Sequence, residues 1–335
     1  MKLLITGGAG FLGARLAREL LAKGELAGSK LSQVVLADQF PSPADLAADP
    51  RVQVLTGPLL EQCSGFAQAK FDGVFHLASA VSGECEADFD LGMRSNLDST
   101  RALLDALRAA GNKPRVLFSS SVAVYGPDPA HPLPDVVTDD TFTTPQTSYG
   151  AQKLMCEYLV ADYSRKGFID GRSARLMSVS VRPGKPNGAA SSFFSGIIRE
   201  PLAGEISVCP VDASVSHPVA SPGKTIEGLI KVFEATREAY RGRTAMNLPG
   251  LNITVAQMLD ALEAVAGPEV RARVRFERNA QIAGIVANWS QGATAQRAAD
   301  LGLMPDADFQ AIIRQYIADC DLAGLGASAL KGFRR

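Results

Sequence analysis

The sequence is poor in the residues that build metal sites and disulfide frameworks. It contains three histidines and five cysteines among 335 residues. No two cysteines form a C-x-x-C pair, and the histidines lie far apart in the sequence. An odd number of scattered cysteines is typical of a reducing compartment. We therefore expect a cytoplasmic protein without a metal site.

The sequence also lacks a strong net charge and a long apolar run. The formal net charge is −1, so no broad basic field is available for nucleic acid, which we do not expect as a partner. No apolar run reaches the roughly 18 residues that a membrane-spanning helix needs, and the first residues carry no secretory signal pattern. Hydrophobic residues make up 46% and charged residues 21%, which indicates an ordinary globular protein.

What the sequence does contain is an alternation of short apolar runs and helical patterns. This alternation predicts an α/β fold with a Rossmann-type doubly wound parallel sheet. We expect a Rossmann domain over residues 1–182 and a smaller C-terminal α/β substrate lobe over residues 183–335. A segment near residues 244–248 is expected to return to the Rossmann sheet. The expected strands are 2–6, 33–38, 52–55, 73–77, 115–119 and 175–182, and the expected helices are 11–23, 89–110, 149–165, 192–201, 225–240, 254–266 and 309–319.

A glycine triplet connects the first expected strand to the first helix. Gly7, Gly10 and Gly13 allow a tight turn, a close approach of the backbone to a pyrophosphate and close helix packing. Asp38 ends the second strand, where a carboxylate accepts hydrogen bonds from ribose hydroxyls and repels a 2′-phosphate. The pattern therefore predicts NAD, and not NADP, as the cofactor. A structural turn and a solvated carboxylate are the alternative interpretations of the glycines and of Asp38.

A tyrosine and a lysine form the candidate proton-transfer pair. Tyr149 and Lys153 stand four residues apart, which places both on one face of a helix. A nearby ammonium favours the phenolate, the form in which tyrosine accepts a proton. Such a pair alone is more typical of an amphipathic helix. It becomes specific beside the glycine triplet and the run FSSSVAVYG at residues 118–126.

In these motifs the sequence resembles the extended short-chain dehydrogenase/reductase family, also called the NAD-dependent epimerase/dehydratase family. The resemblance spans nearly the whole chain. The matching pieces are ITGGAGFLG (5–13), FHLAS (75–79), Asn96, FSSSVAVYG (118–126), SYGAQK (148–153) and VRPGKPN (181–187).

The resemblance implies roles for individual residues. Ser121 would hold the reacting oxygen of the substrate, Tyr149 would accept its proton, and Lys153 would also bind the nicotinamide ribose. Asn96 is expected to brace the sheet and not to take part in catalysis. Further cofactor contacts are implied for Phe11, Leu12, Leu59, Ala78, Ser79 and Pro183. Leu59 belongs to a Gly-Pro-Leu run where many relatives have Gly-Asp, so the adenine would rely on backbone contacts there.

Four segments, 78–96, 162–172, 182–205 and 246–259, resemble family members that oxidise C2 of a four-carbon sugar acid. The implied reaction is NAD-dependent oxidation of a small 2-hydroxy sugar acid such as D-erythronate to the 2-oxo acid. The R-x-x-N-V-Y-G-P run typical of nucleotide-sugar enzymes is replaced at residues 182–187. A carboxylate needs cations or hydroxyl donors, and the candidates, each of which could equally be a surface or packing residue, are Arg182, Ser191, Ser192, Arg199 and Lys224.

Two other functions remain open from the sequence. A nucleotide-sugar epimerase or dehydratase would use the same residues and return the hydride to its substrate. A catalytically silent NAD-binding sensor is the other alternative, although the presence of Ser121, Tyr149 and Lys153 argues against it. The resemblance also implies a homodimer that pairs through the helices expected at residues 89–110 and 149–165.

Overall fold

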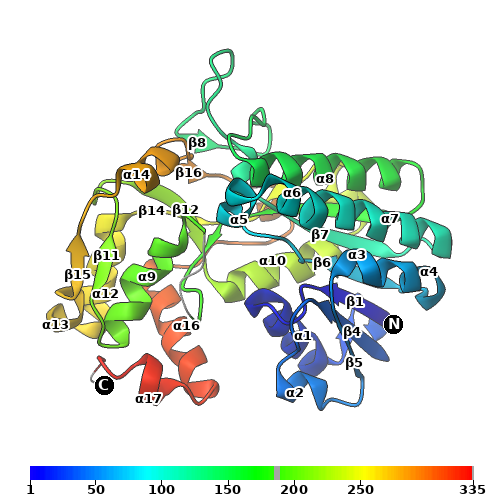
Figure 1. The fold of residues 1–335 in the computed structure, drawn as a ribbon, viewed down its shortest axis with the longest axis horizontal. Coiled ribbons are helices and arrows are strands. Elements are labelled where there is room, and N and C mark those ends of the chain that lie inside the picture. Colours follow the sequence, from blue (N-terminus) through cyan, green and yellow to red (C-terminus); the bar gives the residue numbers. More distant parts are fainter. Residues whose placement is uncertain (185–188, 334–335) are drawn as a thin grey trace.

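The computed structural model describes residues 1–184 and 189–333. Its centre is a seven-stranded sheet in the order β13-β9-β7-β6-β1-β4-β5, in which every neighbouring pair runs parallel (Figure 1). The strands are β1 (Lys2–Thr6), β4 (Gln33–Asp38), β5 (Val52–Thr56), β6 (Gly73–His76), β7 (Arg115–Ser121), β9 (Asp170–Leu176) and β13 (Met246–Asn247). The predicted Rossmann-type parallel sheet is confirmed.

Helices cover both faces of this sheet because its strands are apolar on both sides. One face packs against α1 (Phe11–Lys23) and α10 (Pro222–Glu234), which share a core with Leu3, Phe75 and Leu117. The other face packs against α4 (Phe66–Ala69), α7 (Ser99–Ala110) and α8 (Ser148–Arg165). Short elements complete this part of the chain: β2 (Glu25–Leu26), β3 (Ser29–Lys30), α2 (Ala44–Ala47), α3 (Leu59–Gln62), η1 (Cys63–Gly65), α5 (Ser82–Ala87), α6 (Phe89–Gly92), η2 (Met93–Asp98) and η3 (Val122–Val124).

One expected strand lies elsewhere. The sequence predicted a strand over residues 175–182, whereas β9 occupies Asp170–Leu176 and the chain then leaves the large sheet. The sequence DGRSARL of β9 is too polar to be recognised as a buried strand. It can be buried because Arg172 and Arg175 form ion pairs with Asp170 and Glu157. These ion pairs, which only the tertiary structure supplies, make the strand possible.

The second part of the molecule has its own core beside the large sheet. A three-stranded sheet contains β10 (Ser178–Val179), β12 (Ser216–Ala220) and β14 (Leu251–Thr254), and a two-stranded sheet pairs β11 (Ser207–Cys209) with β15 (Val274–Phe276). Phe194, Met258 and Ile312 anchor its apolar core. The remaining elements are α9 (Ser192–Leu202), α11 (Arg237–Tyr240), α12 (Val255–Ala266), α13 (Pro268–Arg271), α14 (Ala280–Val286), α15 (Gln296–Ala299), α16 (Phe309–Leu322) and α17 (Gly326–Ala329), together with the pair β8 (Val136–Val137) and β16 (Gly292–Ala293).

The chain crosses between the two parts more than once. After β10 it builds α9, then returns through α10 to cover the large sheet, and β13 adds the edge strand beside β9. The chain beyond residue 182 therefore contributes to both parts.

Candidate active site

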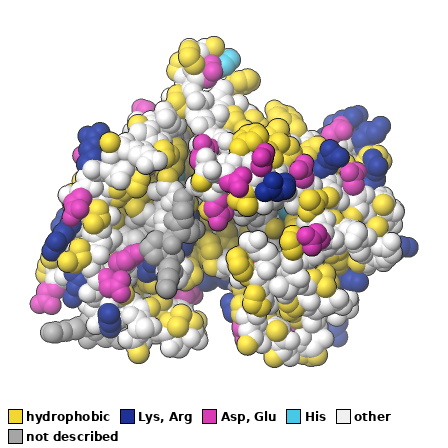
Figure 2. Space-filling view, viewed as in Figure 1, with side chains coloured by type: hydrophobic (Ala, Val, Ile, Leu, Met, Phe, Trp, Pro, Cys, Tyr) yellow, Lys and Arg dark blue, Asp and Glu magenta, His cyan; other side chains and the backbone are white. Residues whose placement is uncertain are grey.

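A single cleft of about 2070 Å³ runs along the carboxyl ends of the parallel strands and continues against the second part of the chain. The space-filling view shows the molecule hollowed between these two parts (Figure 2). In an open parallel sheet this edge is where ligands bind. Both the part around the large sheet and the second part line this cleft, so residues within 7–13 and within 277–290 face the same cavity.

The glycine turn forms the first wall. Gly7 has a φ of +72°, a conformation that side chains rarely adopt, and its amide donates to the Ala37 carbonyl at 2.8 Å. A Cβ at Gly13 would lie 2.1 Å from the Gly7 carbonyl oxygen, so α1 can approach the turn only with glycine there. No acidic side chain occupies the first turn of α1. The helix start is therefore suited to an anionic group, and all five expected residues, Gly7, Gly10, Phe11, Leu12 and Gly13, line the cleft.

Asp38, the last residue of β4, lines the cleft beside the glycine turn. Its carboxylate accepts hydrogen bonds from the Ala9 amide and the Phe40 amide, both at 3.0 Å. These bonds fix the carboxylate beside the glycine turn, with Leu59 at the start of α3 across from it in the same cleft. A fixed carboxylate at this place has the position expected for a ribose contact.

Ala78 and Ser79 follow β6 and also line the cleft. Asn96 holds this loop, because its Oδ1 accepts from the Ser79 hydroxyl at 3.0 Å and from the Ala80 amide at 2.7 Å. Its Nδ2 donates to Gln152 on α8 at 2.8 Å. Asn96 lies in a π-helical turn within the expected helix over residues 89–110, which is helical throughout. Asn96 therefore has the bracing position expected from the sequence.

Ser121, Tyr149 and Lys153 all line the cleft near the end of β7. The Ser121 oxygen accepts from the Ala123 amide at 3.1 Å, which leaves its O–H able to donate. Lys153 is buried, donates to the Ser119 carbonyl at 2.9 Å, and lies 5.5 Å from the centroid of the Tyr149 ring. The structure thus brings the three expected residues together.

A buried polar network supports this arrangement from behind. Glu157, one turn after Lys153 on α8, accepts from the Ser120 hydroxyl at 2.5 Å and pairs with Arg175 of β9 at 2.8 Å. Arg175 also donates to the Tyr125 hydroxyl at 2.7 Å. These contacts fix α8 against β7 and β9, and hence the register of Tyr149 relative to Ser121. No sequence motif marks Glu157 or Arg175, and only the fold brings them together.

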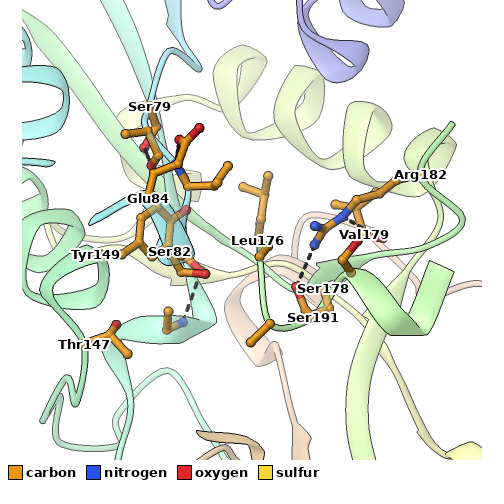
Figure 3. Close-up of a pocket in the computed structure, with 18 of the residues that line it drawn as sticks. Ser79, Ser82, Glu84, Thr147, Tyr149, Leu176, Ser178, Val179, Arg182 and Ser191 are labelled. Atoms are coloured by element: carbon orange, nitrogen blue, oxygen red, sulfur yellow. Dashed lines mark hydrogen bonds between the residues drawn. The ribbon is translucent and has the colours of Figure 1, made fainter. Parts of the chain in front are cut away.

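On the opposite side of the cleft lies a second polar group (Figure 3). Arg182 donates to the Val179 carbonyl and to the Ser191 hydroxyl, both at 3.0 Å. Burial lowers the pKa of the Arg182 guanidinium, and the charge of Arg199 adds to that lowering. Ser191 and Ser192 line the cleft beside it.

Three sequence candidates lie away from the cleft wall. Arg199 is buried, and its guanidinium donates to the Arg182 carbonyl at 2.8 Å and to Glu200 at 2.6 Å, so it supports Arg182 from behind. Lys224 pairs with Glu227 on the surface of α10 at 2.8 Å. Pro183 is exposed and does not line the cleft, and residues 185–187 of the VRPGKPN run lie outside the described residues.

The cleft also contains residues that the sequence did not suggest. Ser178 follows β9 and lines the cleft together with His217 of β12 and Trp289 after α14. Glu84 and Thr147 lie on the Tyr149 side (Figure 3). These residues belong to separate stretches of the chain, and no short motif connects them.

The three histidines occupy unrelated environments. His76 is buried in β6 between the hydroxyls of Thr6 and Thr100, and burial lowers its pKa to about 3. His131 packs against Phe142 in the loop before α8, and His217 lies in β12. Among residues 1–184 and 189–333, no group of three or more histidine, cysteine or acidic side chains is arranged to hold a metal ion. No helix in the same ranges is long and apolar enough to cross a membrane.

Comparison with known proteins places this architecture in a family. The NAD dependent epimerase/dehydratase family matches residues 3–224. D-erythronate dehydrogenase from Cupriavidus necator is 49% identical over 96% of this chain and 100% of its own length. D-erythronate dehydrogenase from Haemophilus influenzae is 41% identical over 95% of this chain and 99% of its own length.

A solved structure agrees in fold and sequence. The crystal structure of a nucleoside-diphosphate-sugar epimerase from Agrobacterium tumefaciens superimposes with a TM-score of 0.89 and 42% identity, covering 97% of this chain and 95% of that one. The expectation drawn from the sequence motifs is confirmed: this chain belongs to the NAD dependent epimerase/dehydratase family.

Proposed function

We propose that this protein is an NAD-dependent dehydrogenase that oxidises the C2 hydroxyl of D-erythronate to give the 2-oxo acid. The observation that carries the proposal is near-full-length identity of 41% and 49% to two proteins named D-erythronate dehydrogenase. The geometry is compatible, because Ser121, Tyr149 and Lys153 share one cleft with the cationic Arg182.

The residues of the first wall fit NAD. A Cβ at Gly7 or Gly13 would lie within 3 Å of backbone atoms, so the turn stays close to the strand ends, and the start of α1 would hold the pyrophosphate. Asp38 would accept hydrogen bonds from the adenosine ribose and disfavour a 2′-phosphate, while Leu59, Ala78 and Ser79 would line the adenosine part. When bound there, NAD would supply the hydride acceptor for the oxidation at C2.

The protein itself handles the proton. The Ser121 hydroxyl donates to the C2 oxygen and fixes its position, and Tyr149 as phenolate accepts the C2 hydroxyl proton. Lys153, held by the Ser119 carbonyl, places its ammonium beside the Tyr149 ring and favours the phenolate. The C2–H bond breaks as the C2–O double bond forms.

The substrate carboxylate would bind at Arg182. Its guanidinium is held in one orientation by Val179 and Ser191, which reduces the entropy lost on binding. Ser191 and Ser192 line the same cleft and would add hydroxyl groups to this polar wall. Arg199 would act indirectly, through the Arg182 carbonyl.

Nucleotide-sugar epimerisation is the second candidate, and the name of the Agrobacterium tumefaciens structure favours it. The two reactions differ in their net products, since an epimerase returns the hydride to the sugar. We would assay purified protein with NAD and a panel of hydroxy acids and UDP-sugars. NADH formation with D-erythronate supports the dehydrogenase. Epimerisation of a UDP-hexose without net NADH, together with no reaction on D-erythronate, would replace it by the epimerase.

We also propose that the protein is a cytoplasmic homodimer. The exposed side chains of Phe89, Met155 and Tyr158 lie on α6 and α8, where Figure 2 shows hydrophobic side chains gathered. Burying such a patch against a second copy would remove it from water. Light scattering of the purified protein tests this, and a monomer at micromolar concentration would contradict it.

A further inference from the structure

Ser178 and His217 face the cleft opposite Tyr149, and the reaction described above uses neither of them. Ser178 lies in β10 and His217 in β12, which pair in parallel within the small sheet. The Ser178 hydroxyl is 2.8 Å from Nε2 of His217. The two side chains therefore form a hydrogen-bonded pair at the cleft surface (Figure 3 shows Ser178 beside Arg182 and Ser191).

The other ring nitrogen decides the direction of this hydrogen bond. Nδ1 of His217 lies 3.2 Å from the Ser290 carbonyl oxygen, which can only accept. Nδ1 must therefore carry the proton. Burial, together with the charge of Arg182, lowers the pKa of His217 to about 4, so the ring is neutral at physiological pH. Nε2 then has a lone pair and no proton, and the Ser178 hydroxyl must donate to it.

Aromatic packing keeps the histidine ring in this orientation. The ring stacks on Phe194 of α9 at 5.3 Å between centroids and 3° between planes. Trp289 packs against it at 5.0 Å, and only 2% of His217 is exposed. A ring flip would separate Nδ1 from Ser290 and Nε2 from Ser178, so both hydrogen bonds and the stack favour one orientation.

Since the proton of Ser178 is committed to His217, its oxygen offers the cleft only lone pairs. Such an oxygen binds a donor and repels a carboxylate. Arg182 next to it is a pure donor, which suits a carboxylate. Two neighbouring groups on this wall of the cleft thus have opposite hydrogen-bonding character.

We propose that Ser178, oriented by His217, accepts a hydrogen bond from a substrate hydroxyl beyond the reacting carbon, and thereby selects polyhydroxy acids over simple 2-hydroxy acids. The inference rests on the proposed function for the identity of the acid. In D-erythronate the hydroxyl in question is that on C3 or C4. Ser178 is a specificity-determining residue, and His217 is a positioning residue that acts through it.

The first experiment compares substrates with and without the hydroxyl. We would measure kcat/KM for D-erythronate, its 4-deoxy analogue 2,3-dihydroxybutanoate and its 3-deoxy analogue 2,4-dihydroxybutanoate. In the unsubstituted protein, loss of the contacted hydroxyl should lower kcat/KM by about 3- to 10-fold, the usual range for one neutral hydrogen bond. Ser178→Ala should lower kcat/KM for D-erythronate by a similar factor, mostly through KM, and should leave the affected analogue unchanged.

Matched variants separate this role from a structural one. Ser216 lies in the same small sheet, donates its hydroxyl to the Gln291 carbonyl and does not line the cleft. Ser216→Ala should therefore leave kcat/KM within about 2-fold of the unsubstituted protein. His217→Phe keeps a ring against Phe194 but frees the Ser178 proton, and should reproduce the Ser178→Ala pattern. His217→Gln, whose amide oxygen can accept from Ser178, should recover part of the discrimination.

The second experiment requires no substrate. With ¹⁵N-labelled histidine, imidazole nitrogen shifts should show a neutral His217 with the proton on Nδ1 at neutral pH. A proton on Nε2, or a cationic ring at neutral pH, would overturn the proposal, as would equal sensitivity of Ser178→Ala to all three acids. If D-erythronate is not oxidised at all, the proposed function fails. The same hydroxyl comparison is then made on whichever acid or sugar of the panel reacts, and a loss of discrimination in Ser178→Ala still decides the role of Ser178.

Discussion

The two ends of the cleft are built in different ways. At the cofactor end, the glycine turn, Asp38 and Ala78 each lie at or within two residues of the carboxyl end of a strand of the large sheet, so the strand itself positions them. At the substrate end, Ser178, Ser191, His217 and Trp289 come from four separate elements of the second part and its borders. Cofactor binding depends on local backbone geometry, whereas substrate selection depends on which distant groups meet.

The largest loss of activity is expected for a substitution at Tyr149, where the cofactor end and the substrate end of the cleft meet. Tyr149→Phe deletes the proton acceptor and should lower kcat by about 100- to 10,000-fold. NAD binding, measured by titration calorimetry, should be largely kept, because the phenyl ring remains. Tyr158→Phe, an exposed tyrosine on the same helix, is the control. Retention of more than about a tenth of the activity by Tyr149→Phe would contradict the role.

Arg182→Met tests the cationic side of the substrate end. Loss of a charged hydrogen-bond donor should lower kcat/KM for D-erythronate by about 10- to 100-fold, mainly through KM. Affinity for NAD should change little, since the two ends are independent in this view. Thermal unfolding of the variant checks that the loss of the contacts to Val179 and Ser191 has not disrupted the fold. An unchanged KM in a folded variant would place the carboxylate elsewhere.

Asp38 tests the cofactor end alone. Combining Asp38→Ala with Gln39→Arg removes the ribose acceptor and supplies a phosphate partner, and should shift the ratio of kcat/KM for NAD and NADP about tenfold towards NADP. Gln39→Arg by itself keeps the carboxylate and should shift the ratio less. Equal ratios in all three proteins would show that Asp38 makes no contact with the ribose.

The smallest effect is expected at Lys224. Its ammonium pairs with Glu227 on one turn of α10 and faces away from the cleft. Such a surface pair contributes little, so Lys224→Met should leave KM for D-erythronate within about 2-fold. A clear rise in KM would indicate that Lys224 binds the substrate carboxylate and would contradict the assignment of that role to Arg182 alone.

Three differences between the sequence-based expectations and the structure involve buried polar or charged side chains. The expected strand over residues 175–182 and the actual β9 differ because Arg172 and Arg175 are neutralised by acidic partners from the same strand and from α8. The segment expected as a helix over residues 89–110 is helical throughout, but the sequence did not indicate the π turn within it that contains Asn96, whose side chain reaches the loop after β6 and α8. Arg199 was expected at the cleft, but its hydrogen bonds direct it to the Arg182 carbonyl.

The sequence by itself determined the Rossmann sheet, the glycine turn and the spacing of Tyr149 and Lys153. These features follow from hydrophobic periodicity, from positions that only glycine tolerates, and from the repeat of a helix, all of which are local. Only the tertiary structure decided which cation lines the cleft and which tautomer His217 adopts. The tautomer depends on the Ser290 carbonyl, 73 residues from His217 in the sequence. Which cation lines the cleft depends on how the segments that carry Arg182, Arg199 and Lys224 pack in the folded chain, and nothing local in the sequence specifies that packing.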